Sequence, residues 1–233
     1  IREAKRRGAD EIVVSVFVNP VQFGPNEDYE KYPRDEKADL AKCREAGATA
    51  VFFPTPANMY LDRHSVYVNE EDLSKWLCGA RRPGHFRGVC TVVAKLFNLS
   101  HPDFAVFGQK DYQQAQVIKR MVRDLNFDLK IVVAPIVREE SGLARSSRNT
   151  YLSPEERERA VAISRNLMAF GSKGGAKTLA ALGKSLEKAG LVVDYVECVD
   201  AETLEPRKTP KKGCCILVAA YCGKTRLIDN RVL

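Results

Sequence analysis

The feature that most constrains the fold of this chain is a near-continuous apolar run at residues 11–18, Glu-Ile-Val-Val-Ser-Val-Phe-Val. A β-branched run without regular polar alternation is typical of a strand that is covered on both faces. Three further short apolar runs follow, each reached through a segment of helical character, at 48–53, 104–107 and 129–137. This alternation predicts an α/β domain built on a parallel sheet.

The segments between these strands predict helices and two long loops. The first helix should end at Gly47, because glycine accepts the left-handed backbone that commonly closes a helix. A loop is expected over Asn19–Pro33, and a second one over Gly79–Gly88, between two of the helices. The expected helices cover 35–46, 70–78, 89–99 and 111–125.

The pattern changes after about residue 137. Ser153-Pro-Glu-Glu156 combines a cap residue, a proline in the first turn and a capping-box glutamate, and it predicts a helix reaching to about Phe170. After a glycine-rich break, a second helix and three strands are expected at 178–189, 194–199, 214–221 and 225–229. We therefore divide the chain into an α/β part, residues 1–136, and a smaller α+β part, residues 137–233.

Composition excludes some classes of protein. No stretch approaches the roughly 18 apolar residues that a membrane span needs. The 7 cysteines include no C-x-x-C pair, which favours a reduced, cytosolic protein. None of the 3 histidines lies at zinc-ligand spacing from a cysteine, so structural zinc is not expected. The net charge of +7 suits an anionic ligand, and a nucleic-acid-binding module is one alternative. The basic residues lack interleaved aromatics, however, so no stacking platform for single-stranded nucleic acid is indicated.

Ligands of an open parallel sheet bind beyond the carboxyl ends of its strands. The segment after the third strand, Gly108-Gln-Lys-Asp111, leads straight into a helix. Free backbone amides and the helix dipole favour an anion there, and Asp111 shares a helix face with Gln114. The alternative is an ordinary turn in which Lys110 is a surface charge and Asp111 a cap.

A second polar cluster follows the fourth strand. Arg145, Ser146, Ser147 and Arg148 supply two guanidiniums and two hydroxyls, which match phosphate oxygens. A plain polar loop is the alternative, but two such clusters at neighbouring strand ends favour a polyphosphate or nucleotide site. His85 could act as a general acid or base, or merely bond backbone. The residues are typical of group transfer by positioning and charge stabilisation.

Five motifs together resemble the pantothenate synthetase family, in order and separation. The likeness extends to Leu217-Val-Ala-Ala and Arg226-Leu-Ile-Asp-Asn230, so it covers nearly the whole chain. The five motifs are Val18-Asn-Pro-Val-Gln-Phe-Gly24, Tyr32-Pro-Arg34, Arg82-Pro-Gly-His-Phe-Arg-Gly88, Phe107-Gly-Gln-Lys-Asp-Tyr-Gln-Gln114 and Ser146-Ser-Arg-Asn-Thr-Tyr-Leu152.

The resemblance implies a Rossmann-like nucleotidyltransferase domain with a small C-terminal domain, usually in a homodimer. It also implies ATP-dependent condensation of (R)-pantoate with β-alanine through pantoyl adenylate, with release of pyrophosphate and AMP. Gln22 and Gln114 would hold pantoate, while Asn19, Tyr32, Arg82 and His85 would line or close the substrate cavity. The implied ATP-binding residues are Gly108, Gln109, Lys110, Asp111, Val137, Arg145, Ser146, Ser147 and Arg148; Lys110, Ser146, Ser147 and Arg148 would act on the phosphates.

The chain departs from the family in three places. Gln109 stands where the family often has Glu, and Arg145 where it often has Met or Leu. The family's first strand and its H-x-G-H segment, which supplies the proton donor, would lie upstream of Ile1, so we expect a fragment of a longer polypeptide, with poor activity or none if it is complete. Another adenylyl or cytidylyl transferase and a non-catalytic remnant are the alternatives. The sequence reveals no metal ligands, although Mg²⁺ is expected with the nucleotide.

Overall fold

The computed structural model describes residues 1–25 and 27–233 and divides them into two compact units. Unit 1 comprises residues 1–107 and 117–134, and unit 2 comprises 108–116 and 135–233. Helix α6 (Tyr112–Asp124) is divided between them, with residues 112–116 in unit 2 and residues 117–124 in unit 1. No helix among the described residues is long and apolar enough to cross a bilayer.

Unit 1 contains short parallel-sheet elements with helices, in accordance with the predicted α/β class. Its strands form two separate pairs, β1 (Val13–Ser15) with β2 (Ala50–Phe52) in parallel, and β3 (Phe104–Gly108) with β4 (Lys130–Ala134). Its helices are α1 (Arg2–Arg6), α2 (Glu36–Ala46), α3 (Pro56–Met59), α4 (Leu77–Arg81) and α5 (His85–Ser100), with 3-10 turns η1 (Pro20–Gln22) and η2 (Leu73–Lys75).

The predicted ends of several elements are confirmed for local reasons. The Asp35 side chain caps α2, and Gly47 ends it in the left-handed region with φ +90°. The expected strand over 129–137 is shorter than predicted: β4 stops before Pro135, because proline has no N–H to donate to a neighbouring strand. In the expected loop over 19–33, the 3-10 turn η1 occupies the beginning, and residue 26 lies outside the described residues.

Two expectations for unit 1 were wrong. Residues 70–78 do not form one continuous helix, because the Glu70 carboxylate accepts the backbone N–H groups of Asp72, Leu73 and Ser74 at 2.8–3.0 Å and folds the chain into η2, so that a helix, α4, begins only at Leu77. The first strand is not covered on both faces: Val13 is 54% exposed, and β1 pairs only with β2 among the described residues. The expected loop over 79–88 is reduced to residues 82–84, since α4 extends to Arg81 and α5 already begins at His85.

α5 forms the centre of the unit 1 core. Ten of its residues are buried, and Phe97 makes edge-to-face contacts with Phe107 of β3 and with Phe127, at ring-centroid distances of 6.5 and 5.6 Å. Such aromatic pairs add to the stabilisation that burial alone provides. The C-terminal end of β3, where the anion site is expected, is therefore held on a well-packed scaffold.

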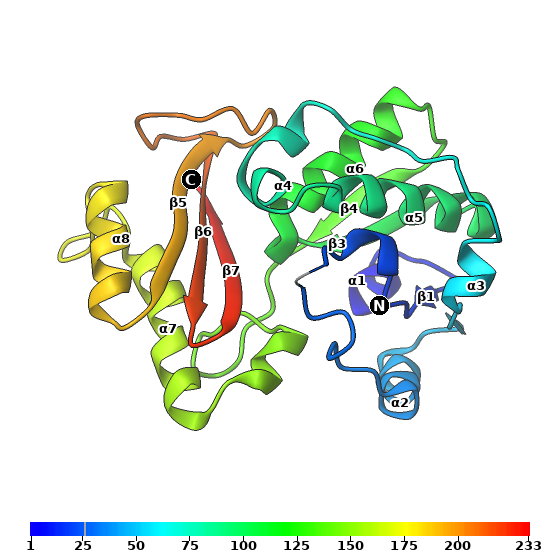
Figure 1. Ribbon diagram of the computed structural model, residues 1–233, viewed down its shortest axis with the longest axis horizontal. Coiled ribbons are helices and arrows are strands. Elements are labelled where there is room, and N and C mark those ends of the chain that lie inside the picture. The colour runs from blue at the N-terminus through cyan, green and yellow to red at the C-terminus, as the bar shows by residue number, and fades with distance from the viewer. Residues whose placement is uncertain (26) are drawn as a thin grey trace. The chain divides into compact units, whose positions relative to one another are not determined.

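Unit 2 is an antiparallel sheet with helices on one side (Figure 1). The strand order is β5 (Val192–Asp200), β6 (Cys214–Cys222) and β7 (Thr225–Val232), and the helices are α7 (Pro154–Ala169) and α8 (Leu179–Lys188). The predicted capping box is confirmed, with Ser153 and Glu156 exchanging hydrogen bonds. Cys214 and Cys215 are buried free thiols, as expected of cysteines in an apolar strand.

The turn after β5 provides a test of acid stability. The Asp200 carboxylate accepts the backbone N–H groups of Thr203 and Glu202 and a hydrogen bond from Arg207, and these contacts lower its pKa from 3.8 to about 2. A carboxylate with a depressed pKa stabilises the fold above its unfolded-state pKa and loses that contribution as the pH falls toward its folded-state pKa.

We therefore expect the melting temperature of Asp200→Asn to lie below that of the unsubstituted protein at pH 7. The difference should shrink between about pH 4 and pH 2, the interval between the unfolded and folded pKa values. Thermal unfolding followed by circular dichroism across this range checks the prediction. A difference that stays constant with pH would show that the carboxylate charge plays no part.

Candidate functional site

The segment after β3 is a tight turn that opens onto α6. Gln109–Asp111 forms the 3-10 turn η3 with Gly108 as its N-cap residue, and α6 continues from Tyr112. Lys110 is partly buried, and its Nζ lies 3.5 Å from Asp111 Oδ1. Gln114 follows Asp111 by three residues, which places both on one face of the helix start. The turn therefore presents one ammonium and one carboxylate at the beginning of a helix.

The second polar segment is shaped by a small backbone loop. Arg138 and Ala144 form an isolated antiparallel bridge, and the turn between them uses Gly142 at φ +93°, a conformation that favours glycine. The Arg145 N–H then donates to the Val137 carbonyl at 2.9 Å. This pairing fixes where the chain enters the Ser146–Arg148 segment.

Ser146 begins the 3-10 turn η4 (Ser147–Tyr151). Its Oγ accepts the backbone N–H of Arg148 at 3.2 Å, so it caps the turn. Ser147 and Arg145 are exposed and Arg148 is half-buried, so one hydroxyl and two guanidiniums lie on a short stretch of the chain. The cap supports the polar-loop interpretation of Ser146, whereas the three donors within four residues support the anion-binding interpretation of the segment.

Asn149 anchors this turn from inside unit 2. It is buried, and its Nδ2 donates to Glu139 Oε1 at 2.9 Å and to the Ala144 carbonyl at 3.0 Å. Arg157 of α7 donates to Glu139 Oε2 at 2.8 Å and to the Asn149 carbonyl at 3.0 Å. The hydrogen bond from Asn149, supported by the Arg157 hydrogen bond and charge, lowers the pKa of Glu139 against the opposing effect of desolvation. Glu139 is therefore a structural carboxylate.

Unit 1 contains a separate polar cluster around Asn19. This buried side chain donates through Nδ2 to the Gly88 carbonyl at 3.1 Å and to Gln22 Oε1 at 3.2 Å. Its Oδ1 accepts the Tyr60 hydroxyl at 2.7 Å, and burial raises the pKa of Tyr60 to about 12, so the hydroxyl remains a donor at neutral pH. Asn19 thus orients the Gln22 amide and ties it to α5.

Arg82 and His85 belong to the same cluster. Arg82 makes a bidentate pair with Glu27, at 2.7 and 2.5 Å, and its Nη1 lies 3.0 Å from His85 Nε2. Guanidinium nitrogens only donate, so Nε2 accepts and the ring proton on Nδ1 goes to the Gln22 carbonyl, 2.9 Å away. His85 is therefore a neutral histidine that bonds backbone, and Arg82 holds it in that tautomer.

Glu27 is the partner that the sequence did not reveal. Burial raises its pKa, but the Arg82 hydrogen bond and charge outweigh that effect and leave the pKa below its ordinary value. Tyr32 makes an edge-to-face contact with Phe23, which follows Gln22 in the chain, at a ring-centroid distance of 5.8 Å. Arg82 is thus already neutralised in this structure, and it shapes the cluster by positioning His85.

The structure therefore groups the predicted residues by unit. Unit 1 brings together Asn19, Gln22, Arg82 and His85 by direct hydrogen bonds, with Tyr32 on the same loop. Unit 2 contains the remaining ones: Gly108, Gln109, Lys110, Asp111, Gln114, Val137, Arg145, Ser146, Ser147 and Arg148. The ammonium, guanidinium and hydroxyl groups of the unit 2 residues are donors that bind anionic oxygens, whereas the unit 1 cluster contains the side-chain amides of Asn19 and Gln22.

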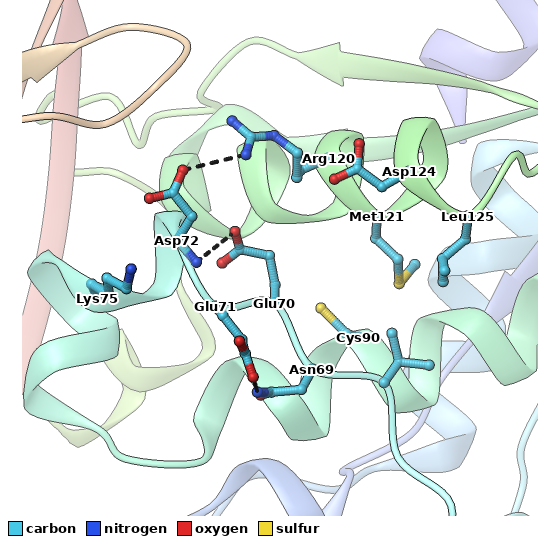
Figure 2. Close-up of a pocket in the computed structure, with 11 residues that line it drawn as sticks. Asn69, Glu70, Glu71, Asp72, Lys75, Cys90, Arg120, Met121, Asp124 and Leu125 are labelled. Atoms are coloured by element: carbon cyan, nitrogen blue, oxygen red, sulfur yellow. Dashed lines mark hydrogen bonds and ion pairs between the residues drawn. The ribbon is translucent and has the colours of Figure 1, made fainter.

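A cavity of about 520 Å³ lies elsewhere in unit 1, between the segment Val68–Asp72 and α6 (Figure 2). None of the predicted site residues lines it. Its carboxylates have local partners, because Glu70 accepts backbone N–H groups and Asp72 accepts Arg120 Nη1 at 3.3 Å (Figure 2). Among the described residues, no group of three or more His, Cys, Asp or Glu side chains could hold a metal ion.

Comparison with known proteins decides which family the chain belongs to. The sequence profile of the family described as pantoate-beta-alanine ligase matches residues 1–232. The chain belongs to this family. A pantothenate synthetase from Myxococcus xanthus is 54% identical over 242 residues, with 100% of this chain and 82% of that protein covered. One from Clostridium novyi is 52% identical over 95% of this chain and 81% of its own length.

Solved structures agree in fold. Pantothenate synthetase from Thermus thermophilus superposes with a TM-score of 0.90 at 46% identity, over 99% of this chain and 86% of that one. Pantoate-beta-alanine ligase from Francisella tularensis, solved with β,γ-ATP and β-alanine, gives a TM-score of 0.84 at 32% identity over 99% and 82%. The expected family and the α/β fold with a smaller α+β part are confirmed.

Sequence reasoning missed the residues that hold the ligase motifs in place. Glu27 and Tyr60 in unit 1, and Glu139 and Arg157 in unit 2, were not singled out, although each bonds directly to a motif residue or its backbone. Asn149 lies inside the motif Ser146–Leu152, and its place there was the one sequence signal that pointed to these supporting contacts. Long-range partners such as Glu27 and Arg82, 55 residues apart, leave no local pattern in a single sequence.

Proposed function

We propose that this chain catalyses the ATP-dependent condensation of (R)-pantoate with β-alanine to pantothenate. The observation that carries the proposal is membership of the pantoate-beta-alanine ligase family over residues 1–232, with both phosphate-type motifs in one compact unit. The structure of the Francisella tularensis relative in complex with β,γ-ATP and β-alanine supports the same substrates here.

In the proposed reaction, a carboxylate oxygen of pantoate attacks the α-phosphorus of ATP, and the bond to the β-phosphate oxygen breaks to release pyrophosphate. The β-alanine amine then attacks the acyl carbon of pantoyl adenylate, loses a proton and displaces AMP. Lys110 and Arg148, with the hydroxyls of Ser146 and Ser147, bind the phosphate oxygens and stabilise the charge that develops on them.

The rest of the nucleotide contacts are assigned to the same unit. The space beside Gly108 is open to a ligand, because among the described residues no heavy atom other than those of its chain neighbours lies within 4 Å of the position its Cβ would take. Gln109, Val137 and Arg145 flank the two phosphate segments. Mg²⁺ would neutralise phosphate charge; Asp111, whose side chain is 47% exposed, fits the single-carboxylate coordination that magnesium–nucleotide sites use.

The acid and amine substrates are assigned to amide donors. Gln22 and Gln114 hold pantoate, and Gln22 also reaches β-alanine. Asn19, Arg82 and His85 support this role by fixing Gln22: Asn19 bonds its side chain and His85 bonds its carbonyl. Tyr32 contributes to the wall of the substrate cavity. In these assignments the other residues of the unit 1 cluster hold the Gln22 side chain in position.

The test is release of AMP from ATP by the purified protein. AMP formation should require both pantoate and β-alanine, whereas exchange of labelled pyrophosphate into ATP should require pantoate alone. Absence of AMP above background would refute the proposal. Exchange supported equally by unrelated acids would instead indicate a different nucleotidyltransferase.

We also propose that the enzyme is a cytoplasmic homodimer divided functionally at about residue 136. The dimer follows from the family resemblance alone. The seven cysteines, all free in this structure, accord with a reducing compartment. The compact units divide the chain differently, since residues 108–116 group with the C-terminal part, so the functional boundary stays a prediction. Light scattering on the purified protein tests the dimer.

A further inference from the structure

Asn230 of β7 is buried against the turn that contains Lys110. Its side chain is 2% exposed, and its Nδ2 donates to the carbonyls of Gln109 and Lys110 at 2.9 and 3.1 Å. Its Oδ1 accepts the Gln109 side-chain amide at 3.1 Å. One amide group therefore makes three hydrogen bonds to two successive residues, which fixes both the backbone and one side chain of the turn.

Asp229, the preceding residue, holds the second polar segment. It is 4% exposed and receives Arg138 in a bidentate pair at 2.7 and 3.0 Å. Arg138 also donates to the Gly142 carbonyl at 3.1 Å, so the pair secures the turn that leads to Arg145. The Asn230 N–H closes the arrangement by donating to Asp229 Oδ1 at 2.8 Å.

The strand geometry explains how two adjacent residues can hold two separate segments. Successive side chains of a β-strand point to opposite faces, so Asp229 and Asn230 diverge from one backbone. Both residues are paired with the central strand β6, opposite Val218 and Leu217. The Lys110 turn and the segment that leads to Ser146–Arg148 are therefore both anchored to the same strand, β7, within unit 2.

We propose that Asp229 and Asn230 are positioning residues for ATP: they keep the Lys110 turn and the Ser146–Arg148 segment in the mutual geometry that phosphate binding needs. The proposal rests on the proposed function. Gln109 belongs to this device as well, because its side chain bonds Asn230. A displacement of about 1 Å of a binding group can reduce a reaction rate by about 10²-fold, so the anchoring matters for the reaction as well as for folding.

The experiment separates the two half-reactions. Asn230→Ala should lower pantoate-dependent pyrophosphate exchange by about 10²-fold and raise the KM for ATP. The same variant, given pantoyl adenylate and β-alanine, should release AMP at a rate within about three-fold of the unsubstituted protein, because that step needs no ATP. Asp229→Asn, which keeps the shape and removes the charge, should show the same split.

Leu227→Ala provides the matched control. Leu227 lies in the same strand, is 5% exposed and packs in the apolar core of unit 2. This variant should lower the melting temperature through the cavity it leaves while keeping pyrophosphate exchange within about two-fold at a temperature where it is folded. Loss of both half-reactions in parallel with stability in Asn230→Ala, or exchange within about two-fold of normal, would overturn the positioning role.

ATP binding supplies a readout that does not depend on turnover. ATP should raise the melting temperature of the unsubstituted protein, and this shift should be largely lost in Asn230→Ala. Equal shifts in both proteins would overturn the inference. If the unsubstituted protein binds ATP but catalyses neither half-reaction, the proposed function fails, and the shifts of the variants still decide the positioning role.

Discussion

Replacing Lys110 by alanine should slow formation of the adenylate by about 10²–10³-fold, the cost of removing one preorganised charge from a developing phosphate transition state. The stability of the fold should change little. Among the described residues, the side chain's only ion pair is the 3.5 Å contact with the partly exposed Asp111, and pairs of that kind contribute about 0–1 kcal/mol. Pyrophosphate exchange and thermal unfolding, measured on the same preparation, check both parts.

Lys119→Ala is the control for the loss of a lysine. Lys119 is exposed on α6, only nine residues further along the chain, and its replacement should leave the exchange rate within about two-fold. If Lys110→Ala lost activity only in proportion to the loss of folded protein, Lys110 would be a structural residue. A similar loss in Lys119→Ala would point to net charge as the cause.

Replacing Gly88 by alanine should destabilise the protein strongly. A Cβ on Gly88 would lie 2.6 Å from the Val21 carbonyl oxygen and 2.7 Å from the Gln22 backbone, where no flexible side chain can move aside. Alanine is favoured over glycine in a helix by about 1 kcal/mol, but overpacking of this kind costs about 3 kcal/mol or more. We expect the melting temperature to fall by about 5 °C or more.

The same substitution should also weaken pantoate binding, because the Gly88 carbonyl accepts the Asn19 amide that orients Gln22. Gly183→Ala, in the interior of α8, is the matched control: its Cβ would meet only Val196 Cγ2, at an ordinary 4.0 Å. That variant should be more stable by about 0.5–1 kcal/mol. Equal melting temperatures for the two variants would contradict the close contact between α5 and η1.

Local signals in the sequence predicted most helices and strands correctly. The capping box at Ser153, the glycine after α2 and the β-branched runs act through a few neighbouring residues. Their effect on local structure can therefore be predicted from the sequence alone. The helix expected over 70–78 failed because Glu70 captured three backbone N–H groups, an interaction that competes with helix formation.

The sequence by itself determined the family, the α/β class and the residue types that can meet phosphate. Only the tertiary structure decided which of them are free to act: Arg82 is paired with Glu27, His85 is held neutral between Arg82 and a backbone carbonyl, and Gln109 is directed to Asn230. The physical reason is distance along the chain. Hydrogen bonds that join residues 55 to 121 positions apart depend on how each unit packs, and spacing in one sequence carries no record of them.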